Sequence, residues 1–356
     1  MKKEELPLSG IKVVDASTVL AGPSVGMYLA ELGAEVLKVE HPKYSDVTRS
    51  WKLPGEPSES DVSAYFSSIN YGKTYQKLDL KNTADRNAFG QLISDSDILL
   101  MNFKRSDYAK FQLTNKDLAA INPQLITGKI SGYGTESDRV AYDLILQAES
   151  GFMSMNGQPD GPPTKMPVAF VDVLAAHHLK EALLLALYTR ERSGKGAILN
   201  VSLYDAAVSS LVNQASNYLM TGNVPQRLGS KHPNIAPYGE LFTTRDGRTI
   251  TFAIGSDAHF QKLCETLNAK ELIEDDRFLS NQDRVVHRET LYALLSSHVS
   301  AWSSNTLLDQ LQSLNVPAGA VKNLEEVFSD PKAKSLVLEE TIDGILTKRV
   351  ASAIFT

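Results

Sequence analysis

The first 130 residues alternate short apolar runs with longer amphipathic ones. The apolar runs lack the polar alternation of a half-exposed strand, which is typical of strands buried on both faces. The stretches between them place apolar residues at helical spacing. The strands are expected at 11–15, 35–40, 97–101 and 125–130, and the helices at 24–32, 85–93 and 115–121. Strands and helices in this order predict βαβ units and a parallel sheet that helices cover on both sides.

The segment 131–171 breaks this pattern, because it is poor in helix signals and rich in glycine and proline. A segment of this length without secondary structure usually carries function in a compact α/β protein. A strong helix is predicted directly after it, at 173–192, followed by a strand at 197–201.

The pattern changes again after residue 223. Two runs rich in β-formers meet at Asp246-Gly247, a pair that predicts a hairpin turn, and polar helices follow. We expect two domains. A large α/β domain is formed by 1–223 together with 330–356, and a smaller α+β domain by 224–329.

Composition narrows the possible functions. The 356 residues are 42% hydrophobic, which is enough for a real core, and the net charge of −6 argues against a general nucleic-acid binder. A single cysteine, Cys264, excludes a disulfide framework and is expected to be a buried apolar residue. Residues 1–5 are charged with no apolar stretch behind them, and no apolar run approaches the ~20 residues of a membrane span. We expect a cytoplasmic protein without a membrane segment or a metal site, since the seven histidines show no ligand spacing.

The turn after the first strand allows several interpretations. Gly22-Pro23-Ser24-Val25-Gly26 matches the nucleophile elbow of hydrolases in form, but about six residues separate Ser24 from the strand. A dinucleotide site would place an acidic residue at Glu40, yet Pro23 removes an N–H where a pyrophosphate needs donors. The remaining possibility is a tight turn without chemistry.

A series of motifs along almost the whole chain resembles the class III CoA-transferases, the family of formyl-CoA and carnitine CoA-transferases. The longest are LSGIKVVDASTVLAGP at 8–23 and LGAEVLKVE at 32–40. The others, in order, are Asp46 and Arg49, Gly72-Lys73, LDLK at 78–81, Asn102-Phe103, Tyr142-Asp143, QAESG at 147–151, Gly161-Pro162-Pro163 and Gly194-Lys195-Gly196. One motif alone is weak, but this many in the same order are specific.

The resemblance implies a Rossmann-like large domain, an interlocked homodimer and transfer of coenzyme A from an acyl-CoA to a small carboxylic acid. It implies no nicotinamide, flavin or metal. It also brings one alternative, because α-methylacyl-CoA racemases share the fold and move a proton at Cα with a histidine and an aspartate. Tyr142-Asp143 stands where those enzymes have His-Asp, which favours the transferase. Formyl-CoA transferases carry a glycine-rich loop where this chain has 229–239 without one, which argues against formate or oxalate.

Asp172 is the candidate nucleophile. It follows the glycine- and proline-rich segment and starts a long helix, where a carboxylate is favoured. From the residues alone, the interpretation of Asp172 as only an N-cap is favoured. The resemblance places the family's catalytic aspartate here, which implies attack on the donor thioester, then an aspartyl-CoA thioester, then transfer to the acceptor.

The resemblance also implies a set of CoA contacts. His41 and Lys110 stand where relatives often have arginine, so weaker or rearranged phosphate binding is expected. Arg139, Lys165 and His232 hint at a second carboxylate on the substrate. The implied contacts are Thr18, Val19, Leu20, Ala21, His41, Leu78, Lys81, Asn102, Phe103, Lys110 and Tyr142.

Overall fold

The computed structural model describes residues 6–355 and divides into two compact units. The large unit consists of Met1–Phe152, Lys165–Asn223 and Lys332–Thr356, and the small unit of Met153–Thr164 and Val224–Pro331. Residues 1–5, for which we expect no signal peptide, lie outside the described residues. Between 6 and 355, no helix combines the length and the apolar character needed to span a membrane.

The large unit is built on a six-stranded sheet with the order β3-β2-β1-β4-β5-β6. Every neighbouring pair is parallel, which confirms the predicted α/β fold. The strands are β1 (Lys12–Ala16), β2 (Glu35–Glu40), β3 (Lys73–Lys77), β4 (Ile98–Met101), β5 (Ile126–Ser131) and β6 (Ala197–Ser202). The order reverses between β1 and β4, and at such a switch point a doubly wound sheet opens a crevice at the carboxyl ends of its strands.

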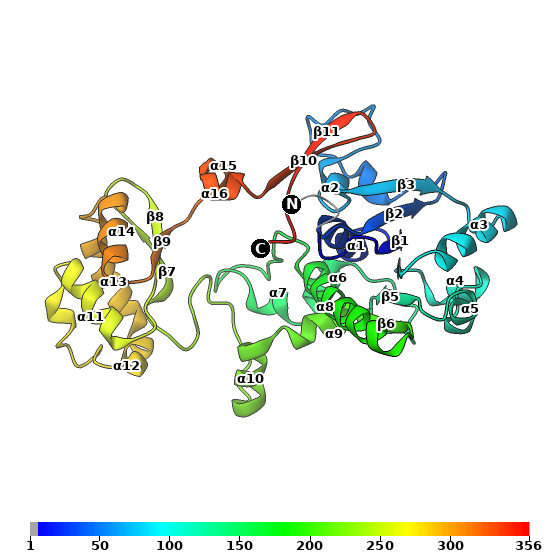
Figure 1. Ribbon diagram of the computed structural model, residues 1–356. Coiled ribbons are helices and arrows are strands. Elements are labelled where there is room, and N and C mark those ends of the chain that lie inside the picture. The colour runs from blue at the N-terminus through cyan, green and yellow to red at the C-terminus, as the bar shows by residue number, and fades with distance from the viewer. Residues whose placement is uncertain (1–5, 356) are drawn as a thin grey trace. The chain divides into compact units, whose positions relative to one another are not determined.

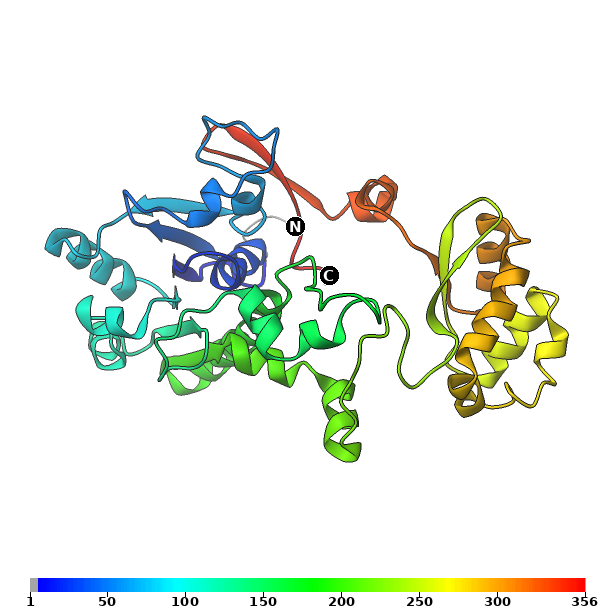
Figure 2. The ribbon, with the colours of Figure 1, turned by 180° about the vertical axis from the view of Figure 1, so that it is seen from behind.

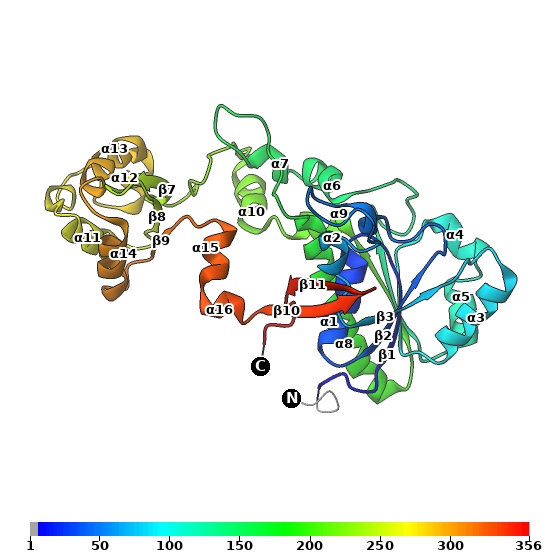
Figure 3. The ribbon, with the colours of Figure 1, turned by 90° about the horizontal axis from the view of Figure 1, so that it is seen from above.

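Helices cover both faces of this sheet (Figures 1 and 3). On one face lie α1 (Ala21–Glu31) and α8 (Phe170–Ser193), whose apolar residues form one core cluster with β1, β2, β4 and β5. On the other face lie α3 (Thr83–Ser94) and α5 (Asn115–Ile121), which contribute to a second cluster. The remaining helices of the chain up to residue 223 are α2 (Ala64–Ser67), α4 (Arg105–Lys110), α6 (Asp143–Glu149), α7 (Phe152–Met155), α9 (Leu203–Ser209) and α10 (Val212–Thr221), with a 3-10 turn η2 (Val47–Ser50).

Two local predictions are wrong, and one strand was missed. The segment 131–171, expected to be poor in helix, contains α6 and α7. The helix expected to begin at Ser24 begins at Ala21, so Gly22-Pro23 belongs to its first turn. Proline is tolerated there because the first turn's N–H groups have no intrahelical acceptor in any case. The edge strand β3 was not predicted, since its sequence KTYQK is mostly polar.

The chain returns to the large unit through α15 (Leu324–Ser329) and α16 (Pro331–Lys334) and ends in a hairpin of β10 (Val337–Ile342) and β11 (Ile345–Val350). These strands pair only with each other and lie beside α2 (Figure 2). Arg349 forms a buried ion pair with Glu31 at the end of α1, and the N–H groups of Ser352 and Ala353 donate to the same carboxylate.

The small unit contains a three-stranded antiparallel sheet of β7 (Tyr238–Thr243), β8 (Thr249–Ala253) and β9 (Ala318–Ala320). The hairpin predicted around Asp246-Gly247 is confirmed, with Gly247 at a φ of 76°. Cys264 is buried in the core of this unit, as expected. The helices are α11 (Asp257–Thr266), η3 (Lys270–Leu272), α12 (Asn281–Val286), α13 (Arg288–Val299) and α14 (Ser304–Ser313).

Candidate functional site

A cleft of about 520 Å³ opens in the large unit where β1, β4, β5 and β6 end. It includes the point where the strand order reverses. Five of the predicted contact residues line it: Thr18, Val19, Asn102, Phe103 and Tyr142. They come from three places in the chain that the parallel sheet brings to one edge, so the topology alone explains why they meet.

Leu20, Ala21 and Lys110 flank this cleft without lining it. Leu20 is the N-cap residue of α1, and Ala21 is buried behind it. Lys110 ends α4, with its Nζ 3.8 Å from Asp107 and 5.2 Å from the ring of Phe111, which in turn packs against Phe103.

His41, Leu78 and Lys81 form a separate group, where the chain leaves β2 and β3. His41 Nε2 lies 3.4 Å from an oxygen of Asp79, and the N–H of Lys81 donates to the same carboxylate. Leu78 is buried in the core behind them. The His41 imidazole and the backbone N–H of Lys81 therefore contact one aspartate, at the edge of the sheet that also carries the cleft.

Lys129 is a cation in the cleft that our sequence prediction missed. It lies on β5, with its ammonium 2.8 Å from Asn115 Oδ1 and 4.4 Å from the centre of the Tyr108 ring. Burial lowers its pKa. The sequence did contain a signal for it, because Lys129 is a single charged residue in an otherwise apolar strand. A charged residue near the carboxyl end of such a strand indicates a functional site.

Asp172 lies in the first turn of α8 and is 6% exposed. Burial, followed by the charge of Asp143, raises its pKa from 3.8 to about 7. The same carboxylates affect Tyr65, whose pKa rises to about 12 through burial and through the charges of Asp172, Asp143 and Asp46. A buried carboxyl group whose pKa is raised this far is unusual, and shifts of this size gather at functional sites.

Asp143 caps the helix that carries Asp172. Its Oδ1 accepts from the N–H groups of Val171, at 2.7 Å, and of Asp172, at 3.4 Å. Its Oδ2 accepts from the Gln147 amide, whose oxygen accepts from the N–H of Met166. The interpretation of Asp172 as an N-cap is therefore wrong: Ala169 holds the N-cap position, and Asp143 supplies the cap from α6.

Tyr142 connects the cleft to this carboxylate pair. It lines the cleft and is also the N-cap residue of α6, directly before Asp143. The cleft and Asp172 thus share α6 as a common support.

The structure also decides the two alternatives for the first turn. Ser24 is buried inside α1, and its hydroxyl donates to the carbonyl of Ala21, so it is not an exposed nucleophile. Glu40 is buried in an ion pair with Arg49 at 2.7 Å, so it is not available to a ribose.

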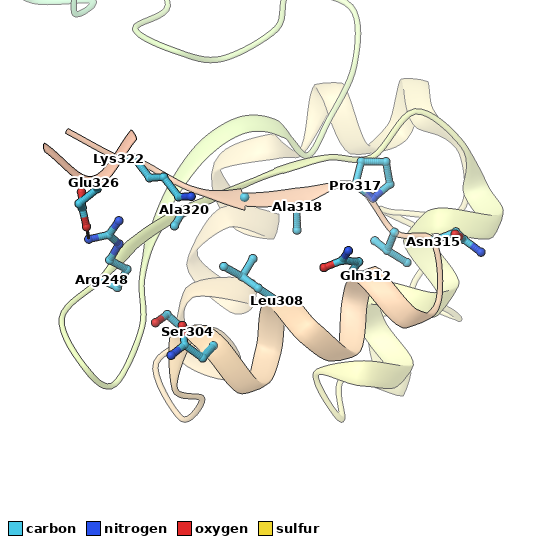
Figure 4. A pocket seen from close by; sticks show the side chains of 13 residues that line it. Arg248, Ser304, Leu308, Gln312, Asn315, Pro317, Ala318, Ala320, Lys322 and Glu326 are labelled. Atoms are coloured by element: carbon cyan, nitrogen blue, oxygen red, sulfur yellow. Dashed lines mark hydrogen bonds and ion pairs between the residues drawn. The ribbon is translucent and has the colours of Figure 1, made fainter. Parts of the chain in front are cut away.

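A larger hollow, about 800 Å³, lies in the small unit between β9 and α14 (Figure 4). Its charged residues are Arg248 and Glu326, which form an ion pair with each other, and Lys322. The described part of the chain holds no group of three or more metal-ligating side chains here or elsewhere. None of the predicted site residues lines this hollow.

The fold and the cleft together define a class of protein, a doubly wound α/β protein with its site at the switch point of a parallel sheet. The sequence profile of CoA-transferase family III matches residues 8–350, and the chain belongs to this family.

Comparison with similar proteins supports this family assignment. The chain is 38% identical to a succinate–glutarate CoA-transferase of Agrobacterium fabrum, over 99% of this chain and 90% of the relative. It is 34% identical to an acetyl-CoA:oxalate CoA-transferase of Acetobacter aceti, over 93% of this chain and 84% of the relative. The crystal structure of a CAIB/BAIF family protein from Brucella suis has a TM-score of 0.84 and 37% identity, covering 99% of this chain and 93% of that one. The resemblance found in the sequence is confirmed, and the chain is a CoA-transferase.

Proposed function

We propose that this enzyme moves coenzyme A from an acyl-CoA donor to a small dicarboxylate, with Asp172 as the covalent nucleophile. The observation that carries the proposal is a buried first-turn carboxyl group with a pKa of about 7, set beside Asp143 and joined through α6 to the cleft.

The first half of the reaction leaves CoA on the protein. An ionised Asp172 oxygen attacks the thioester carbonyl carbon, the carbon–sulfur bond breaks, and CoA thiolate leaves a mixed anhydride on the aspartate. The thiolate then attacks the aspartyl carbonyl carbon. The anhydride bond breaks, the donor acid leaves as a carboxylate, and an aspartyl-CoA thioester remains.

The second half repeats these steps with the acceptor. Its carboxylate attacks the aspartyl thioester and releases CoA thiolate. The thiolate then attacks the acceptor's acyl carbon, which gives the new acyl-CoA and regenerates the Asp172 carboxylate. A carboxylate of raised basicity is the stronger nucleophile, so the environment of Asp172 suits the first attack.

We propose that the cleft holds the pantetheine and acyl part of the substrate through Thr18, Val19 and Tyr142, with Leu20 and Ala21 supporting the same turn from behind. The nucleotide end of CoA is assigned to Asn102 and Phe103, with His41, Leu78, Lys81 and Lys110 beyond them. Lys129 adds a cation that the phosphates of CoA can use.

A dicarboxylate is favoured as acceptor by two observations. The relatives at 38% and 34% identity are named for succinate, glutarate and oxalate, all of which are dicarboxylates. Arg139 also lines the cleft, paired with Glu149 and 4.4 Å from the Tyr133 ring. A guanidinium has five N–H donors, so we propose that Arg139 binds the second carboxylate while it stays paired with Glu149.

We also propose a homodimer of the interlocked kind. Apolar side chains stand on the outer faces of α8 and α10 in the large unit: Leu185 is 67% exposed, Tyr188 63%, Leu219 77% and Met220 85%. Exposed apolar faces of this kind are typical of an obligate interface.

The direct test is to incubate the enzyme with succinyl-CoA and to measure its intact mass. We expect a CoA adduct that hydroxylamine removes, with peptide mapping placing the resulting hydroxamate on residue 172. A panel of acetyl-CoA, glutaryl-CoA and oxalyl-CoA defines the donor class. If no donor labels the protein, the covalent route is wrong.

Asp143→Asn tests the electrostatic part of the proposal. Because the Asp143 charge raises the pKa of Asp172, its removal should lower that pKa, while the amide oxygen can still cap α8. In the native enzyme kcat/KM should rise with pH through about 7. In the variant the acid limb should move to lower pH, and Gln147→Met, which keeps both charges, should leave it in place. An acid limb that stays at the same pH in Asp143→Asn would contradict the assignment of this limb to Asp172.

A further inference from the structure

The turn between β1 and α1 has an unusual backbone. Val19 has a φ of 73°, a left-handed conformation that a β-branched residue rarely adopts. The preceding residue is held firmly: the N–H of Thr18 donates to Asn102 Oδ1 at 3.0 Å, and the Thr18 carbonyl accepts from Asn102 Nδ2 at 2.9 Å. Thr18 and Val19 both line the cleft. Strain of this kind persists only where the surroundings fix it.

The fixing group is the Asp46 carboxylate. Both of its oxygens accept from the N–H of Val19, at 3.2 and 3.3 Å. Asp46 is buried, and the ammonium of Lys38 lies 3.1 Å from it with no solvent exposure of either side chain. The same ammonium donates to the carbonyl of Ser17 at 2.8 Å. The buried Lys38–Asp46 ion pair therefore holds the turn before and after Thr18. Lys38 binds the carbonyl before it, and Asp46 binds the N–H after it.

We propose that Asp46 is a positioning residue for acyl-CoA binding, which holds Val19 in its left-handed conformation and thereby keeps the Thr18–Val19 wall of the cleft formed before substrate arrives. The inference rests on the proposed binding of acyl-CoA at this turn. Asp46 itself does not line the cleft, so its effect passes through the backbone of Val19.

The effect of losing the Asp46 carboxylate can be expressed as the fraction of molecules that keep the turn in the conformation that binds substrate. Without the carboxylate, a valine should relax to negative φ in most molecules, and the apparent affinity falls by the fraction that keeps the competent turn. A glycine populates positive and negative φ about equally, so it loses only about twofold. Asp46→Ala, which leaves no side-chain acceptor for the Val19 N–H, should therefore raise KM for acyl-CoA roughly tenfold with kcat changed much less.

Rescue by glycine is the test that separates positioning from general structural damage. Val19→Gly combined with Asp46→Ala should return KM for succinyl-CoA to within about threefold of the native value, whereas Val19→Ala with Asp46→Ala should not. If the glycine rescues nothing, the inference is wrong. The matched control is Glu31→Gln, which also removes a buried carboxylate from an ion pair, but at the opposite end of α1; it should lower the melting temperature and leave KM unchanged.

A second variant covers the case in which Asp46→Ala does not fold. Val19→Pro leaves the Lys38–Asp46 pair in place but confines φ to about −65° and removes the N–H. It should raise KM for succinyl-CoA at least tenfold, and an unchanged KM overturns the inference. Failure of the proposed function looks different: Asp172 variants would then keep their turnover, whatever the variants at 19 and 46 do.

Discussion

Asp172→Asn should reduce CoA transfer at least a thousandfold. The amide keeps the shape of the side chain but has no carboxylate oxygen to form an anhydride, so both covalent intermediates disappear. The expected signature is a loss of kcat together with a loss of the CoA adduct in mass spectrometry, while binding of acyl-CoA, measured by calorimetry, changes little.

The control for this variant is Asp117→Asn. Asp117 also lies in the first turn of a helix, where it takes part in the capping box of α5, but it belongs neither to the cleft nor to the Asp143–Asp172 pair. Its variant should keep activity within about twofold and be slightly less stable than the native enzyme. Turnover above a few per cent in Asp172→Asn would show that another group carries the acyl fragment.

Asp172→Asn should also be more stable than the native enzyme at neutral pH. The pKa of Asp172 is raised on folding, so the folded state holds its proton more tightly and stability falls as pH rises from about 4 to about 7. A shift from 3.8 to about 7 corresponds to about 4 kcal/mol. Asparagine has no proton to lose, so the gap in melting temperature between pH 5 and pH 8 should narrow in the variant.

The sheet could be predicted from the sequence because its strands are apolar without alternation and its helices have clear periodicity. The edge strand β3 was not predicted, because an edge strand needs few apolar residues. The sequence identified Asp172 as the candidate nucleophile. Its burial was not predictable, because that burial depends on the packing of α6 against α8. The role of Asp143 as a cap from another helix is a tertiary contact across 28 residues, and no local signal announces such a contact.

The contact residues show the same limit. Thr18, Asn102 and Tyr142 meet because parallel strands end at one edge, which the predicted topology already implied. The strained φ of Val19 has no local signal, because a valine is the residue least expected there. The sequence therefore predicts part of the set of residues that line the cleft, and long-range contacts decide their conformation and their charge.

The largest loss of stability should follow from Lys73→Met. The Lys73 ammonium is fully buried and lies 2.7 Å from an oxygen of Asp15, 2.8 Å from the carbonyl of Pro23 and 2.8 Å from Asn70 Oδ1. Burial acts to raise the pKa of Asp15, but Lys73 and Lys38 outweigh it and hold that pKa below its usual value. Without Lys73 the Asp15 carboxylate keeps only part of this compensation, and breaking such a pair costs about 3–5 kcal/mol.

Hydrogen exchange of peptides from β1, β2 and β3 measures this loss in the large unit alone, so unfolding of the small unit does not mask it. The exposed pair Lys348–Glu339 supplies the control, since Lys348→Met should cost less than about 1 kcal/mol. Adding Asp15→Asn to Lys73→Met should recover more than half of the loss, because the unpaired charge is then gone while Ser17 still has an acceptor. Additive costs in that double variant would mean that the two side chains stabilise the sheet independently and not as an ion pair.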